Sequence, residues 1–160
     1  MRYGALKKTD IANGDGVRVS LWVSGCERRC KGCFNPETWS YEYGEIFTGK
    51  TVREISEALN KSYISGLTIL GGEPLDPINL PTVTTLIETI RFIYPDKTIW
   101  IYTGYKYEEV KDLKVMDLID VLVDGEFIED QKDISLRFRG SKNQRIINLR
   151  EVRRNEKNRF

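Results

Sequence analysis

Three cysteines, Cys26, Cys30 and Cys33, lie close together in this chain of 160 residues, which has no others. Their spacing, C-x-x-x-C-x-x-C, allows three thiols from a single loop to approach one point. Thiolates are soft ligands that favour zinc or iron–sulfur clusters. The sequence has no histidine, so neither Cys nor His is left as the fourth ligand of a closed structural zinc site. The spacing therefore favours an iron–sulfur cluster with three protein ligands and one open iron.

Two other roles for these cysteines have to be weighed. A disulfide framework needs an even number of cysteines and an oxidising compartment. Here the number is odd, and no charged-then-apolar signal segment opens the chain, so we expect a cytoplasmic protein. A zinc site completed by Asp, by Glu or by a second subunit remains an alternative.

The composition limits the chemistry and the partners. Without histidine the chain lacks the usual general base at neutral pH and the common Ser–His and Cys–His pairs. We therefore expect no catalytic side chain and a cofactor that carries the chemistry. No apolar run approaches the roughly 20 residues that span a bilayer, so no membrane contact is expected. The net charge of +1 argues against broad nucleic-acid binding.

The length and charge pattern predict one domain, residues 1–149, followed by a basic tail, residues 150–160. The tail holds five basic and two acidic residues, a net charge of +3. It is interpreted either as a solvated, frayed terminus or as a basic arm that docks on a partner or a nucleic acid.

Strand and helix patterns alternate along the chain. Strands are predicted at 17–24, 66–70, 98–102 and 118–123, and helices at 51–60, 79–92 and 107–116. Two more strands, 135–139 and 145–149, flank a polar turn; they are interpreted as a closing hairpin or as a contact for an anionic group. The alternation predicts an α/β fold with right-handed crossovers. Because a full eight-unit barrel takes about 250 residues, we expect an open partial (β/α) barrel of about five mostly parallel strands.

Four short motifs each follow a predicted strand: the cysteine loop, Gly71-Gly72-Glu73-Pro74, Thr103-Gly104-Tyr105 and Asp124-Gly125. Ligands of such sheets bind beyond the carboxyl ends of the strands, so these motifs should share one face. The glycine-rich turn lacks the lysine of a phosphate-binding loop and the spacing of a dinucleotide fingerprint. Its backbone and its carboxylate instead suit the ammonium and carboxylate of an amino acid.

The three cysteines followed by the Gly71-Gly72-Glu73-Pro74 turn resemble the radical S-adenosylmethionine (SAM) superfamily. Further stretches are similar to one family within it, the activating proteins of anaerobic ribonucleoside-triphosphate reductase. These stretches are 13–16, 23–26, 32–35 with Thr38-Trp39, Trp100 with 103–106, 123–125, and 139–141 with Asn143-Gln144. They occur in order over nearly the whole chain.

The resemblance implies a [4Fe–4S] cluster held by Cys26, Cys30 and Cys33, with the fourth iron open to the amino and carboxylate groups of SAM. A low-potential electron donor would reduce the cluster, and SAM would be cleaved to methionine and a 5′-deoxyadenosyl radical. That radical would take a hydrogen atom from a glycine of the anaerobic ribonucleoside-triphosphate reductase. The resemblance thus implies an oxidoreductase whose substrate is another protein.

The resemblance also implies contacts with SAM. Gly32, Cys33 and Phe34 would lie along the adenine, and the turn at Gly71 and Gly72 would contact the methionine end. Glu73 would orient that turn rather than act as an acid or base. Asn35 would bind the amino acid group of SAM, and Asp124 would reach the ribose.

Two other functions compete with this one. A radical SAM enzyme that modifies a small molecule would normally need more chain to enclose its substrate. A non-catalytic module, either an electron carrier or a zinc-binding interaction domain, is disfavoured because three thiolates cannot fill the ligand shell by themselves.

Overall fold

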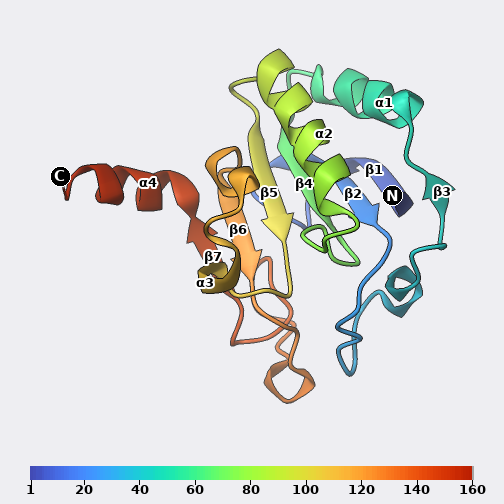
Figure 1. Ribbon diagram of the computed structural model, residues 1–160, viewed down its shortest axis with the longest axis vertical. Coiled ribbons are helices and arrows are strands. Elements are labelled where there is room, and N and C mark those ends of the chain that lie inside the picture. Colours follow the sequence, from blue (N-terminus) through green and yellow to red (C-terminus); the bar gives the residue numbers. More distant parts are fainter. Residues whose placement is uncertain (160) are drawn as a thin grey trace.

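The computed structural model describes residues 1–159, which are organised around one seven-stranded sheet (Figure 1). The strands lie side by side in the order β3-β1-β2-β4-β5-β6-β7. Their bounds are β1 Arg2–Asp10, β2 Val17–Val23, β3 Glu45–Ile46, β4 Ile64–Gly71, β5 Thr98–Tyr102, β6 Val121–Asp124 and β7 Arg145–Asn148. The four central strands β2, β4, β5 and β6 are parallel, so their carboxyl ends lie at one edge of the sheet.

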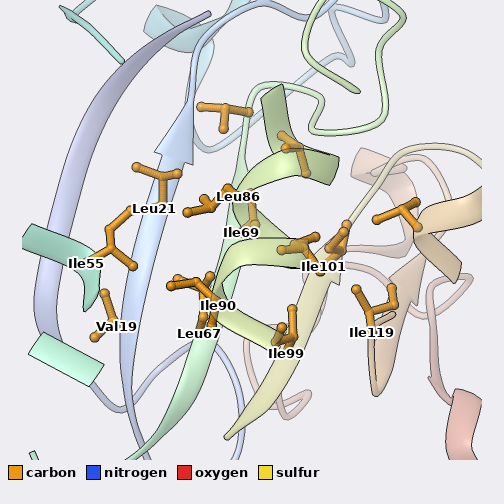
Figure 2. Packing of buried hydrophobic residues seen from close by; sticks show 14 of the residues in the cluster. Val19, Leu21, Ile55, Leu67, Ile69, Leu86, Ile90, Ile99, Ile101 and Ile119 are labelled. Carbon is orange, nitrogen blue, oxygen red and sulfur yellow. The ribbon is translucent and has the colours of Figure 1, made fainter. Parts of the chain in front are cut away.

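Two crossover helices, α1 (Gly49–Leu59) and α2 (Leu80–Ile93), pack on one face of these strands. Figure 2 shows the apolar side chains that meet there, which come from alternate positions of the strands, from one side of each helix and from the segment just before β6. Those labelled are Val19, Leu21, Ile55, Leu67, Ile69, Leu86, Ile90, Ile99, Ile101 and Ile119. Because side chains alternate along a strand, the intervening residues are left on the opposite face of the sheet.

The prediction of about five mostly parallel strands is wrong. The sheet has seven strands, and three of its six neighbouring pairs, β3–β1, β1–β2 and β6–β7, are antiparallel. The two strands missing from the prediction are β1 and β3. Only Tyr3 and Asp10 of β1 are buried, and both residues of β3 are exposed. The apolar alternation that marks a half-buried strand is therefore absent from both.

The predicted strand at 135–139 is also wrong. Residues 125–144 are irregular apart from a short 3₁₀ helix, η3 (Glu129–Gln131), and one isolated bridge. The Asp133 side chain accepts hydrogen bonds from the backbone and hydroxyl of Ser135, which bends the chain into a turn. Phe138 has a φ of +60°, a left-handed conformation that no extended strand adopts.

Two helical segments also depart from the prediction. The helix expected at 107–116 is divided into α3 (Tyr107–Val110) and a 3₁₀ helix, η2 (Lys114–Asp117). Most of the basic tail forms helix α4 (Leu149–Lys157) rather than a frayed end, and it extends away from the sheet in Figure 1. Residue 160, the last of that predicted tail, lies outside the described residues. Among residues 1–159, none of the helices has both the length and the apolar character that crossing a membrane requires.

Candidate functional site

A cavity of about 520 Å³ lies where the four parallel strands end. Its volume is within the range of about 300–1,000 Å³ that is typical of ligand sites. The four motifs predicted to share one face all contribute to its lining, through Cys26, Gly72, Thr103 and Gly125 among others. The parallel core thus brings together segments that are far apart in the sequence.

The cysteine loop, residues 25–33, begins directly after β2. Gly25 has a φ of +105°, a conformation that glycine adopts at low cost. Backbone carbonyls of the 3₁₀ helix η1 (Pro36–Trp39) accept hydrogen bonds from the backbone of Gly25, at 2.7 Å, and of Cys26, at 3.1 Å. The segment that follows the cysteines therefore fixes the start of the cysteine loop.

The three cysteines are unpaired with one another, partly exposed, and all in the lining of the cavity. The Sγ atom of Cys33 accepts a hydrogen bond from the backbone of Asn35 at 3.4 Å. The thiol of Cys30 donates to the Glu126 carboxylate, with 3.6 Å between Sγ and Oε1. The cavity therefore presents three thiols from one short loop.

Burial raises the pKa of the Cys26 thiol. Burial, together with the negative charge of Glu126, raises the pKa of Cys30 to about 11. Both thiols are therefore protonated at neutral pH in the metal-free protein. Because cysteine binds metals as the thiolate, metal binding by these residues has to release protons.

The donor set fits an iron–sulfur cluster. Within residues 1–159, no three Cys, His, Asp or Glu side chains are grouped closely enough to hold a single metal ion. A [4Fe–4S] cluster makes a different demand, because each of its thiolate ligands binds a separate iron. The lining supplies three such thiols beside a cavity large enough for a further ligand.

The turn after β4 packs directly against the cysteine loop. The backbone of Gly72 donates a hydrogen bond to Val23, and that of Glu73 donates to Gly25, both at 2.8 Å. A Cβ atom on Gly72 would lie 2.6 Å from the carbonyl oxygen of Gly25 and 2.9 Å from that of Thr38. The absence of a side chain at Gly72 is therefore what allows the turn and the loop to touch.

Gly71 and Glu73 complete this turn. Gly71 has a φ of +107° and lines the cavity. Glu73 is only 2% exposed, and its carboxylate accepts hydrogen bonds from the Thr103 hydroxyl at 2.7 Å and the Gly104 backbone at 2.8 Å. Burial raises the pKa of Glu73, while these hydrogen bonds and the nearby Arg28 act in the opposite direction. The Glu73 carboxylate ties the turn after β4 to the turn after β5.

Phe34 and Asn35 also lie in the lining. The Phe34 ring packs against Phe127 with 5.0 Å between ring centroids, and the Lys132 ammonium lies 5.1 Å from its centroid. A Cβ atom on Gly140 would come within 2.8 Å of the same ring. Residues of the irregular segment after β6 therefore contact the Phe34 ring, although that side chain is 57% exposed.

Two of the predicted SAM contacts, Gly32 and Asp124, are not among the cavity-lining residues described within 1–159. A Cβ atom on Gly32 would meet the Glu129 carboxylate at 2.9 Å. Asp124 is only 1% exposed, and its carboxylate accepts hydrogen bonds from Arg145 and from the backbone of Tyr107. The contacts of Gly32 and Asp124 with SAM stay predictions.

Several lining residues were not predicted from the sequence. Trp22 and Tyr102 lie on the sheet face opposite α1 and α2, and the two-residue alternation of β2 and β5 could have placed them there. Ile134, Leu136 and Phe138 line the cavity from the irregular segment. Their spacing also alternates, which is why the pattern predicted a strand instead.

Arg18 was missed as well, and it fixes another edge of the site. Its fully buried guanidinium donates five hydrogen bonds, which include 2.8 Å contacts to the hydroxyls of Thr68 and Thr98 and one to the backbone of Asp15. Burial lowers the pKa of Arg18 to about 10, so it is still charged at neutral pH. Thr68 in turn donates to the backbone of Asn13 at 2.8 Å. These bonds hold the loop between β1 and β2, whose Asn13 lines the cavity.

Comparisons with known proteins agree with this chemistry. Residues 12–147 match the family model of a 4Fe-4S single cluster domain. The chain is 42% identical over 146 residues to the anaerobic ribonucleoside-triphosphate reductase-activating protein of Enterobacteria phage T4, covering 91% of this chain and 93% of the relative. It is 44% identical over 154 residues to that of Escherichia coli K12, covering 94% and 100%.

A third relative, from Haemophilus influenzae, carries the same name and is 42% identical over 150 residues, covering 91% of this chain and 97% of the relative. Identity at this level over nearly the full length of both chains extends well beyond the cysteine motif. The chain therefore belongs to the family of anaerobic ribonucleoside-triphosphate reductase-activating proteins.

Proposed function

We propose that this protein activates anaerobic ribonucleoside-triphosphate reductase by generating a glycyl radical on it, with a [4Fe–4S] cluster and SAM as cofactors. The observation that carries the proposal is the shared cavity of three free thiols and a glycine turn. Cys26, Cys30 and Cys33 would each bind one iron. The fourth iron, which has no ligand from the cysteine loop, would be left for the amino and carboxylate groups of SAM.

The cofactors supply the chemistry. When bound, the cluster and SAM would supply one-electron chemistry: with an electron from a low-potential donor, SAM would be cleaved to methionine and 5′-deoxyadenosine, and the hydrogen atom gained by the latter would come from the reductase glycine. The work left to the protein is to hold these groups, to aim them and to exclude water. No side chain has to act as an acid or base, which suits a chain without histidine.

The residues around the cavity have distinct roles in this proposal. The backbone of Gly71 and Gly72 would contact the methionine end of SAM, and Glu73 would keep their turn in place. Phe34 and Asn35 would lie along the remainder of the cofactor. The apolar side chains of the lining would keep water from the reactive carbon.

A protein substrate requires an accessible site. Ile134 lines the cavity and is 91% exposed, so the lining is continuous with the molecular surface. We propose that the open sheet forms a partial barrel that admits a segment of the reductase, and that residues 1–149 make up this radical SAM domain. Free thiols persist in reducing compartments, so we assign the protein to the cytoplasm.

The proposal is tested by assaying SAM cleavage. Protein reconstituted anaerobically with iron and sulfide and then reduced should convert SAM to methionine and 5′-deoxyadenosine. The variants Cys26→Ala, Cys30→Ala and Cys33→Ala should each lose this activity, whereas Arg153→Ala on α4 should retain it. A purified protein that holds zinc and shows no iron–sulfur absorbance after reconstitution would contradict the proposal.

A further inference from the structure

Arg28 lies between the first two cysteines of the loop and lines the same cavity. Its guanidinium stacks over the Tyr105 ring, with 4.3 Å between the guanidinium carbon and the ring centroid. A Cβ atom on Gly104 would lie 2.4 Å from Cδ of Arg28. The turn after β5 therefore accommodates Arg28 in two ways. The Tyr105 ring packs against its guanidinium, and the absence of a side chain at Gly104 leaves room for its Cδ atom.

Two carboxylates flank the guanidinium. The Nε atom lies 3.8 Å from Glu73, and one terminal nitrogen lies 3.8 Å from Glu126. Both separations exceed hydrogen-bond length. The buried Nε atom has no hydrogen-bond partner among residues 1–159. Arg28 is thus held by stacking and by two ion pairs at 3.8 Å, neither of which is short enough to be a hydrogen bond.

The charge of Arg28 also has little access to water, because its side chain is only 24% exposed. A cation in such an environment acts over a longer distance than one on the surface, where water and salt screen it. Arg29, the next residue of the loop, is exposed. The two neighbouring arginines therefore have the same formal charge, but water and salt screen the charge of Arg29 more strongly than that of Arg28.

We propose that Arg28 is a positioning residue that sets the reduction potential of the cluster. This inference rests on the proposed function in one respect, namely that Cys26, Cys30 and Cys33 hold the cluster. The potential of an iron–sulfur cluster depends on nearby charge and on solvent exposure. Reduction adds a negative charge, so a cation fixed in the lining that also presents the three thiols favours the reduced form. Without Arg28, the carboxylates of Glu73 and Glu126 would face the cluster uncompensated.

The experiment is a redox titration of the anaerobically reconstituted protein, followed by the electron paramagnetic resonance (EPR) signal of the reduced cluster. Arg28→Gln should shift the reduction equilibrium at least tenfold toward the oxidised form, which is about 59 mV more negative for one electron. Arg29→Gln is the matched control, because it removes an exposed charge from the same loop. Its potential should equal that of the wild type.

Arg28→Lys separates charge from packing. It keeps the cation but loses the planar group that stacks on Tyr105, so we expect a potential close to that of the wild type. If Arg28→Gln holds too little cluster to titrate, the reduction potential of Arg28→Lys still tests the inference. A tenfold shift in Arg28→Lys, or no shift in a cluster-loaded Arg28→Gln, would overturn the inference. A wild-type protein that forms no cluster would instead contradict the proposed function.

Discussion

Gly72 marks the closest approach between the turn after β4 and the cysteine loop. A methyl group there would press on the carbonyl oxygens of Gly25 and Thr38, at 2.6 and 2.9 Å. Backbone atoms cannot move aside as a flexible side chain can. We expect Gly72→Ala to lower the free energy of unfolding by about 1–3 kcal/mol and to displace the cysteine loop. Denaturant unfolding and SAM binding by the reconstituted protein measure the two effects.

Gly49 provides the control for this substitution. It begins α1, and a Cβ atom there would have its nearest neighbour, the Arg53 side chain, at 4.0 Å. Alanine has a higher helix propensity than glycine, so Gly49→Ala should change the free energy of unfolding by less than about 1 kcal/mol. It should leave SAM binding unchanged. Equal losses in Gly49→Ala and Gly72→Ala would show that the close approach at Gly72 is not the cause.

The sequence predicted that Cys26, Cys30 and Cys33 can approach one point, because they are close in the chain, and the structure places all three in the lining of one cavity. Arg18 and Arg28 could not be found in this way, because their roles depend on partners from distant strands and turns. Asp124 shows the same limit, since its carboxylate binds Arg145 from β7.

Among the elements, α4 is held by contacts that the basic composition of its sequence does not reveal. The Arg153 guanidinium donates to the backbone carbonyls of Met116, at 2.8 Å, and Ile119, at 3.0 Å. We expect Arg153→Ala to lower the free energy of unfolding by on the order of 1–2 kcal/mol. SAM cleavage should not change, because Arg153 is not among the described cavity-lining residues. Thermal unfolding and product assays on the same preparation measure both quantities.

Asp120 makes the docking of α4 dependent on pH. Burial alone would raise the pKa of Asp120, but hydrogen bonds from Arg91, Ile99 and Arg150 lower it below its ordinary value. The ionised carboxylate therefore stabilises the fold above its unfolded pKa of about 3.9. That contribution is lost as the pH falls through the lower pKa of the folded state.

Asp120→Asn should consequently cost about 1.5–3 kcal/mol at pH 7, and the deficit relative to wild type should shrink below about pH 3.9. Denaturant unfolding of both proteins across this pH range provides the measurement. A deficit that stays constant down to acid pH would contradict the role of the ionised carboxylate.

Helices and strands could be predicted from the sequence where burial of one face gives it a clear hydrophobic period. β5 lies at 98–102 as predicted, and α2 differs from its predicted range by one residue at each end. β1 was missed because an outer strand with charged, exposed residues lacks that period. The segment 135–139 has this period but is not a strand: its backbone joins no strand of the sheet, and its apolar side chains line the cavity.

At the scale of the whole molecule, the proposed cluster site is one short loop, and the hydrophobic core of residues 1–159 contains none of its three cysteines. All three cysteines lie in one short loop, so the cluster would cross-link few residues of the chain and add little loop-closure constraint. We expect iron chelation to increase hydrogen exchange in residues 25–40 and in the adjoining turn at 71–75. Exchange in β4, β5 and α2 should not change. Protection lost throughout the sheet would show that the fold depends on the cluster.

The central claim is that this protein places a radical on a glycine of its partner. Its most direct test is the EPR spectrum of anaerobic ribonucleoside-triphosphate reductase after incubation with the reduced, cluster-loaded protein and SAM. We predict a glycyl radical signal whose splitting changes when the reductase contains glycine labelled with ¹³C at Cα, and none with the Cys30→Ala variant. SAM cleavage without any radical on the reductase would contradict the claim.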